Sequence, residues 1–175
     1  QEFETGQINH AWLISGPNGV GKATFAYRVA RYVLSQKTLI QEDHAQELDF
    51  VYNNNTENSD ASDLTMCLEH EDPVFRRVAS GTHADFLSIE RGVDEKSKIL
   101  RKNIIVEDVR AIRSFLNKTP VEADWRVVLI DAADEMTTSA ENALLKVLEE
   151  PPRRALLLLV SHNPSSLLAT SRSRC

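Results

Sequence analysis

The fold of this chain is indicated by one stretch near its start, His10-Ala-Trp-Leu-Ile-Ser-Gly-Pro-Asn-Gly-Val-Gly-Lys22. Its first six residues, 10–15, form an apolar run that predicts a buried strand. The glycine-rich segment behind them fits the spacing G-x-x-x-x-G-K. From Lys22 to Gln36, apolar residues recur at helical spacing and predict a helix. A strand, a glycine-rich turn and a helix in this order are the setting of a phosphate-binding P-loop.

The glycine-rich segment has the chemistry of an anion site. Glycines let the backbone fold tightly, so that successive N–H groups face a phosphate. The start of the helix adds the positive end of its dipole, and Lys22 adds a full charge. A simple tight turn is the alternative, but Lys22 and both flanking elements favour the P-loop. The residues expected to contact a nucleotide here are Gly16, Asn18, Gly19, Val20, Gly21, Lys22, Ala23 and Thr24.

One position departs from the P-loop pattern. The residue after Lys22 is usually Ser or Thr, whose hydroxyl binds Mg²⁺, and here it is Ala23. Thr24 follows, but successive helical side chains point about 100° apart, so Thr24 is not expected to replace that hydroxyl. We therefore expect ATP or ADP at this loop with weak or no dependence on Mg²⁺.

Apolar runs and helical periodicity alternate along the rest of the chain. Further buried strands are predicted at 86–89, 126–131 and 155–161. Helices are predicted from Asp72-Pro73 to Gly81, from about 107 to 117, and from 139 to 149. Less regular segments are 91–102 (hairpin or loop), 104–106 (strand or helix start) and 165–170 (helical or irregular). Apolar strands alternating with helices predict an α/β fold of the P-loop NTPase type, a parallel sheet with helices on both faces.

A second nucleotide motif ends the strand predicted at 126–131. Val127-Val-Leu-Ile-Asp131 has the Walker B pattern, in which the final Asp faces the P-loop and helps to hold Mg²⁺. In ATPases with this motif the next residue is usually a Glu that polarises the attacking water, and here it is Ala132. Asp134 and Glu135 follow on the next turn and are not assumed to substitute. Because loss of a general base costs about 10²–10⁴ in rate, we expect slow hydrolysis or none.

The charge of the chain is concentrated in one segment. The net charge is −6, with 26 acidic and 20 basic residues. Residues 41–72 hold ten acidic residues and no Lys or Arg, so the remainder has 16 acids against 20 bases, or +4. We expect an acidic loop insertion at about 37–72, and a remainder that does not repel an anionic partner. Two distant cysteines, Cys67 and Cys175, suit a reducing compartment and predict a cytoplasmic protein.

Several segments resemble the subunits of bacterial clamp loaders, which belong to the AAA+ ATPases. The resemblance is carried by residues 10–24, by Ala140-Glu-Asn-Ala-Leu-Leu-Lys-Val-Leu-Glu-Glu-Pro-Pro152, and by Ser173-Arg-Cys175. It is closest to the clamp-loader member that does not hydrolyse ATP, and it extends more loosely over 72–117. The matching motifs therefore span most of the chain, from about residue 10 to 175.

The resemblance implies a role in DNA replication as part of a hetero-pentamer. That assembly uses ATP to open a sliding clamp and place it on primer-template DNA. By the same resemblance, Arg174 is an arginine finger that reaches the ATP of a neighbouring subunit, a contact worth about 10³–10⁵ in rate. An ordinary surface arginine is the alternative. The resemblance also places a polar nucleotide contact at the end of strand 155–161, at Ser161 or Asn163.

The resemblance fails in one region. Many clamp-loader subunits carry a four-cysteine zinc module after the P-loop helix, but residues 37–72 contain only Cys67. Cys67-Leu-Glu-His70 has metal-like spacing, and His44 and His83 are further candidates, but a structural zinc needs four ligands in tight pairs. No zinc or other metal site is expected.

Residues 1–175 are interpreted as one AAA+ P-loop domain of a longer subunit, since the family's lid and collar domains would follow. Three alternatives stay open at this point. The chain could be an active motor ATPase of the same family, although Ala23 and Ala132 speak against it. It could be a P-loop kinase or transferase, although its insertion is acidic, or an interaction protein without nucleotide binding.

Overall fold

The computed structural model describes residues 9–36, 71–94 and 96–175. Most of the predicted acidic insertion, at 37–72, lies outside these ranges, so the prediction is not tested there. None of the helices in the described ranges combines the length and the apolar character that crossing a membrane requires.

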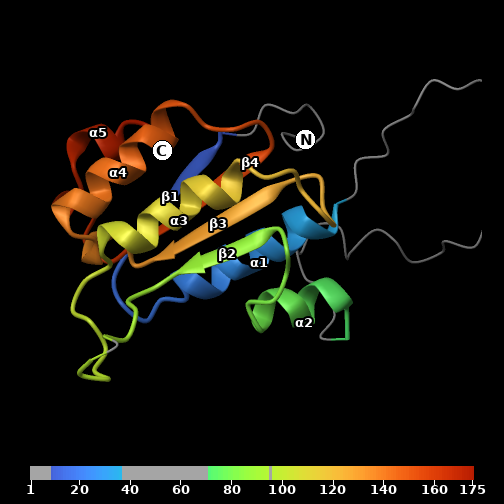
Figure 1. The fold of residues 1–175 in the computed structure, drawn as a ribbon, viewed down its shortest axis with the longest axis horizontal. Helices are drawn as coiled ribbons and strands as arrows, with labels where there is room; N and C mark the ends of the chain where they lie inside the picture. The colour runs from blue at the N-terminus through green and yellow to red at the C-terminus, as the bar shows by residue number, and fades with distance from the viewer. Residues whose placement is uncertain (1–8, 37–70, 95) are drawn as a thin grey trace, which may run out of the picture.

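Four parallel strands form the centre of the described structure (Figure 1). The strands are β1 (Ala11–Ser15), β2 (Phe86–Ile89), β3 (Arg126–Asp131) and β4 (Ala155–Ser161), and their order in the sheet is β1-β4-β3-β2. The register aligns Ser15 with Ser161 and Asp131 with Val160. The carboxyl ends of β1, β3 and β4 therefore meet at one edge. This arrangement confirms the predicted parallel sheet.

Helices cover both faces of this sheet, as predicted. The helices are α1 (Lys22–Ser35), α2 (Pro73–Ala79), α3 (Val106–Leu116), α4 (Thr138–Glu149) and α5 (Ala169–Arg172), with short 3-10 turns η1 (Ala133–Glu135) and η2 (Pro164–Ser166). One core joins α1 and α2 to one side of β3 and β4, and a second core joins α3 and α4 to the other side. Figure 1 shows α3 and α4 side by side on their face.

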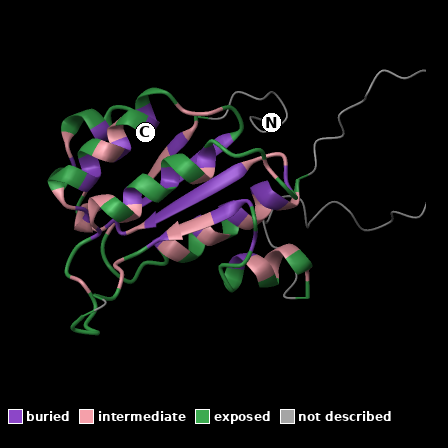
Figure 2. Cartoon of the chain, in the orientation of Figure 1, coloured by how far each residue is buried: buried purple, intermediate pink, exposed green. Residues whose placement is uncertain are grey.

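The two central strands are buried on both faces. Val128 and Ile130 of β3 pack in the core with α3 and α4, while Val127 and Leu129 pack in the core with α1. Figure 2 shows β3 as an almost continuous buried segment. A strand covered on both faces has no polar side, which is why β3 and β4 appear in the sequence as unbroken apolar runs.

Local side-chain bonds set several helix boundaries. Asp72 caps α2 by accepting the N–H of Val74 at 2.6 Å, ahead of Pro73 at the first helical position. Thr137 caps α4 by accepting the N–H of Ala140 at 3.2 Å, so this helix begins one residue before the prediction. Segment 104–106 leads into α3: Ile104 makes only an isolated bridge to Met136, Ile105 is the N-cap and Val106 is the first helical residue.

A buried ion pair holds the connection between α3 and β3. Asp85 is fully buried and accepts backbone N–H bonds from Val121, Glu122 and Ala123 at 2.7–3.1 Å. Arg126, also buried, lies 3.5 Å from Asp85. Burial by itself raises the pKa of Asp85, but these N–H donors and the Arg126 guanidinium outweigh it and hold the pKa below its ordinary value of 3.8.

Candidate functional site

The loop between β1 and α1 has the backbone that the sequence predicts. Gly19 and Gly21 take φ values of 82° and 89°, in the left-handed region that side chains other than glycine seldom adopt. Gly21 is also the N-cap of α1, so the loop passes directly into the first turn of the helix. The N–H of Gly16 donates to the carbonyl of Ser161 at 3.3 Å, which joins the loop to the end of β4.

Lys22 is the charged centre of this loop. Only 7% of the residue is exposed, and its Nζ donates to the carbonyl of Pro17 at 2.7 Å. A nearly buried ammonium stays favourable only while hydrogen-bond acceptors or anions surround it. The loop therefore holds the ammonium group of Lys22 against its own backbone, at the place where a phosphate would bind.

A cavity of about 320 Å³ lies beside this loop. It brings together seven of the predicted nucleotide residues and adds two others. The lining residues are Asn18, Gly19, Gly21, Lys22, Ala23, Thr24, Asp131, Val160 and His162. The two predicted motifs, 109 residues apart in the chain, thus form one site.

Two of the predicted loop residues do not line this cavity. Gly16 and Val20 are not among the residues that line the cavity, and Val20 is 62% exposed. Thr24, which was not expected to stand in for the missing hydroxyl, does lie at the cavity beside Ala23. The roles of these residues toward a nucleotide remain predictions.

The strand end at Asp131 borders a second, smaller cavity of about 230 Å³. Its lining includes Asp131, Ala132, Glu135 and His162, and also Arg91 from the segment after β2. The carboxylate of Glu135 pairs with Arg91 at 2.8 Å. Glu135, one of the acids near Ala132, therefore already has an arginine partner.

Asp134 also has a hydrogen-bond partner. Its carboxylate accepts the backbone N–H of His162 at 2.8 Å, which ties the turn after β3 to the end of β4. Burial raises the pKa of Asp134, but the N–H of His162 and further hydrogen bonds lower it more, so the pKa is below the usual value. Asp134 thus stays ionised at neutral pH as a structural acceptor.

The end of β4 presents a residue that the sequence analysis did not select. Ser161 is fully buried and does not line the cavity, whereas His162 lines both cavities. Within the described part of the chain, the buried Nδ1 of His162 has no hydrogen-bond partner. His162 is the first residue after β4, but no motif spacing in the sequence marks it. The role predicted for Ser161 or Asn163 stays a prediction.

Arg174 lies far from this site. Its guanidinium pairs with Glu149 at 3.1 Å, at the last residue of α4, and both side chains are about half exposed. The carbonyl of Leu148, the preceding residue, lies 3.1 Å from the ring of His10, just before β1. Arg174 is therefore at the amino end of the strands, whereas the loop follows the carboxyl end of β1. At about 3.3 Å per residue, β1 alone separates the two by about 13 Å.

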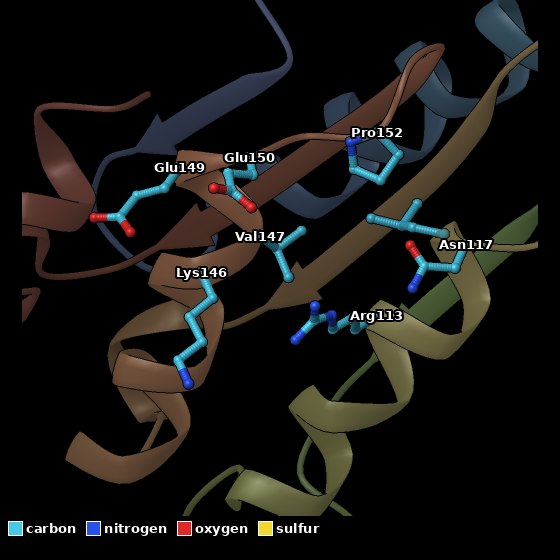
Figure 3. A pocket seen from close by; sticks show the side chains of 8 residues that line it. Arg113, Asn117, Lys146, Val147, Glu149, Glu150 and Pro152 are labelled. Atoms are coloured by element: carbon cyan, nitrogen blue, oxygen red, sulfur yellow. The ribbon is translucent and has the colours of Figure 1, made fainter.

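Two other cavities lie between α3 and α4, and no predicted nucleotide residue lines them. One, of about 320 Å³, is lined at the carboxyl ends of both helices by residues including Arg113, Asn117, Lys146 and Glu149 (Figure 3). In Figure 3 the carboxylate of Glu149 points away from Arg113 and α3. This orientation leaves Glu149 free to meet Arg174.

No metal cluster is found where the structure describes the chain. Within residues 9–36, 71–94 and 96–175, no group of three or more His, Cys, Asp or Glu side chains is arranged to hold a metal ion. His83 lies in this part, and its Nδ1 accepts the N–H of Asp85 at 3.1 Å. His44, Cys67 and His70 lie outside the described residues, so the prediction that no zinc is bound is not tested there.

The chain is matched over residues 1–175 by a family model described as DNA polymerase III, delta subunit. It is 34% identical over 169 residues to the DNA polymerase III subunit delta′ of Pseudomonas aeruginosa, covering 97% of this chain and 42% of that protein. It is 30% identical over 173 residues to subunit delta′ of Escherichia coli K12, covering 99% and 42%.

Subunits of a second type are also similar. The DNA polymerase III subunit gamma of Buchnera aphidicola subsp. Schizaphis graminum is 32% identical over 173 residues, covering 99% of this chain and 38% of that protein. A solved structure of a gamma-subunit-related protein from Thermotoga maritima is 32% identical over 58% of this chain and 33% of that one, with a TM-score of 0.45. The chain thus spans less than half the length of the curated relatives named here.

Proposed function

Because this chain belongs to the DNA polymerase III delta-subunit family, we propose that it is the P-loop domain of a delta′-type clamp-loader subunit. In this role it works with motor and delta subunits in a hetero-pentamer that loads the sliding clamp onto primer-template DNA. Its own contribution is to complete a neighbour's ATP site with Arg174. One observation carries this proposal: Arg174 lies at the opposite end of the sheet from the chain's own phosphate loop.

The position of Arg174 suits use in trans. The guanidinium is too far from the cavity at Lys22 to reach a nucleotide bound there, and it is about 42% exposed at the surface. Arginine keeps its charge at every physiological pH and offers a planar fork of donors that matches phosphate oxygens. Charge that develops on a neighbour's γ-phosphate is what such a group stabilises.

The chain's own cavity fits a nucleotide phosphate better than a catalysed reaction. Backbone N–H groups of the loop, the start of α1 and the buried ammonium of Lys22 suit an anion. The methyl of Ala23 replaces the hydroxyl that would bind Mg²⁺, and Ala132 supplies no base beside Asp131. When bound, Mg²⁺ would neutralise phosphate charge. We infer that ATP or ADP binds here with little help from Mg²⁺ and is hydrolysed slowly or not at all.

The test of the finger uses the full-length subunit in a reconstituted clamp loader. The adjoining motor should be the only subunit that keeps its own P-loop lysine, so that one site is measured. Arg174→Ala should lower turnover at that site by about 10³ while assembly, measured by gel filtration, stays intact. Arg172→Ala, an exposed arginine two residues earlier, is the matched control and should leave turnover unchanged. Equal turnover in the Arg174 variant and the control would refute the proposal.

An active motor subunit is the second candidate, because gamma subunits are also among the relatives. The two roles separate in a simple assay of the isolated full-length subunit. Turnover of around one ATP per second, within the typical enzyme range, would favour the motor. Nucleotide binding by calorimetry that is similar with and without Mg²⁺, together with negligible turnover, would favour the delta′ role.

A further inference from the structure

Glu141 is a buried carboxylate outside the nucleotide site. It lies in the first turn of α4 and is only 6% exposed. A charged side chain is seldom buried to this degree unless it has a partner. Its Oε1 accepts the backbone N–H of Leu168 at 2.5 Å, 27 residues further along the chain. Leu168 is the N-cap residue of α5, so the bond fixes the point where α5 begins.

Helix α5 needs such a partner because it is very short. It has only four residues, one turn, and a helix of this length is not stable by itself in water. The first N–H groups of a helix have no partner within it, and Leu168 has no side-chain acceptor to offer them. Glu141 supplies an acceptor from α4 to the N–H of Leu168, beside a core that already contains Leu167.

The other end of this segment is fixed by packing. The thiol of Cys175 donates to the carbonyl of Ser171 at 3.4 Å, and Cys175 packs against the core beneath α4. The N–H of Arg174 donates to the same carbonyl at 3.3 Å. Ser171 is buried and Arg174 is exposed. The position of the backbone from Leu168 to Cys175 therefore determines the point from which the side chain of Arg174 extends.

The side chain of Arg174 has little else to direct it. Its ion pair with Glu149 is about half exposed on both sides, and such exposed pairs contribute little to stability. We propose that Glu141 is a positioning residue for Arg174, holding α5 on α4 so that the guanidinium meets a neighbour's γ-phosphate. The inference rests on the finger role proposed above. Glu141 itself touches no nucleotide and acts only through the backbone of α5.

The expected effect of losing Glu141 is on the chemical step. A misplacement of about 1 Å in a catalytic group can cost about 10² in rate. Glu141→Ala should therefore lower kcat at the adjoining motor site by about 10- to 100-fold. KM for ATP should stay within about twofold, because a contact made mainly in the transition state changes kcat.

The measurement uses the same single-site clamp loader as the Arg174 test, with each variant's melting temperature and assembly recorded. Glu141→Gln keeps an acceptor oxygen in the same place, so it should retain kcat within about threefold. Glu141→Asp keeps the charge but moves the acceptor oxygen away from the N–H of Leu168, so it should lower kcat. This variant replaces Glu141→Ala in the test if the alanine variant fails to assemble. Glu150→Ala, an exposed glutamate at the end of α4, is the control and should behave as the parent.

A double-mutant cycle separates positioning from general stability. If Glu141 acts through Arg174, adding Glu141→Ala to Arg174→Ala should lower kcat no further. An equal loss in both backgrounds, or an unchanged kcat for Glu141→Ala and Glu141→Asp beside a damaging Arg174→Ala, would overturn this inference and leave the finger role standing. An Arg174→Ala variant as active as the parent would instead refute the proposed function itself.

Discussion

The two ends of the sheet hold very different kinds of site. At the carboxyl end, seven predicted residues line one cavity around Lys22 and Asp131, and the backbone of the loop is complete. At the amino end, the arginine proposed as a finger, Arg174, is exposed and makes one weak ion pair. The first end has a P-loop backbone but has alanines at positions 23 and 132, whereas Arg174 at the second end lines none of the cavities described above. If the proposed roles hold, a phosphate-binding backbone and a catalytic side chain lie at separate ends of one domain.

The first prediction tests whether Ala23 and Ala132 account for the slow hydrolysis that we propose. Ala23→Thr combined with Ala132→Glu should restore a magnesium ligand and a base at the cavity. We expect the turnover of the isolated full-length subunit to rise by at least about 10² over the parent. A steady-state phosphate-release assay measures it. Ala132→Gln with Ala23→Thr is the matched control, since it keeps the shape without the base; comparable rates in both would contradict this account.

Two ion pairs near the amino ends of the strands differ in how far they are buried. Asp85 and Arg126 lie 3.5 Å apart and are buried, while Asp124 and Arg154 lie 3.5 Å apart but exposed. Asp85→Asn should cost about 3–5 kcal/mol of unfolding free energy, because it leaves Arg126 buried without its anion. Asp124→Asn should cost less than about 1 kcal/mol. Urea unfolding at pH 7 measures both, and equal losses would show that burial does not decide the difference.

The same pair predicts a pH dependence. The pKa of Asp85 is lowered in the folded protein, so its contribution to stability is present above the unfolded value, near pH 4. That contribution is lost as the pH falls below 4 through the folded pKa. The Asp85→Asn variant should lack this component, so its stability should fall less steeply than the parent's in acid.

The smallest expected effect concerns the partner of Arg174. Glu149→Gln removes the charge that pairs with the guanidinium but keeps the side chain's size. Because the pair is half exposed, turnover at the adjoining motor site should change by less than about fivefold, and stability by less than about 1 kcal/mol. Glu150→Gln is the neighbouring control. A 100-fold change with Glu149→Gln alone would move the positioning role from Glu141 to Glu149.

Much of the fold follows from patterns that are local in sequence. The strands at 126–131 and 155–161 are buried on both faces and therefore are unbroken apolar runs, and Asp72-Pro73 marks a helix start through its own cap. The segment at 104–106 stayed ambiguous, because three apolar residues fit a strand or a helix equally well. The structure decides for the helix, where Asp108 accepts the N–H of Ile105 at 3.1 Å.

The site was predictable only where a motif fixes it. The loop and Asp131 carry spacing signals, and the structure brings them to one cavity. His162 has no such signal, since its place depends on how β4 ends relative to Asp134, 28 residues away. Glu141 and Asp85 were missed for the same reason. Their partners, Leu168 and Val121, lie 27 and 36 residues further on, and no periodicity relates residues across such distances.

The parallel sheet gives this domain a direction, and that has a consequence for symmetry. Arg174 lies at one end of the strands and the cavity at Lys22 lies at the other, so in the proposed role the surface that offers an arginine and the surface that receives one are different. Two domains built on this plan would therefore pair head to tail rather than about a two-fold axis. Repeated head-to-tail pairing closes into a ring or extends into a filament, and in such a series each subunit's neighbours are not interchangeable. Under the proposed function, a subunit that supplies Arg174 to a neighbour but does not hydrolyse ATP itself would occupy one particular place in that order.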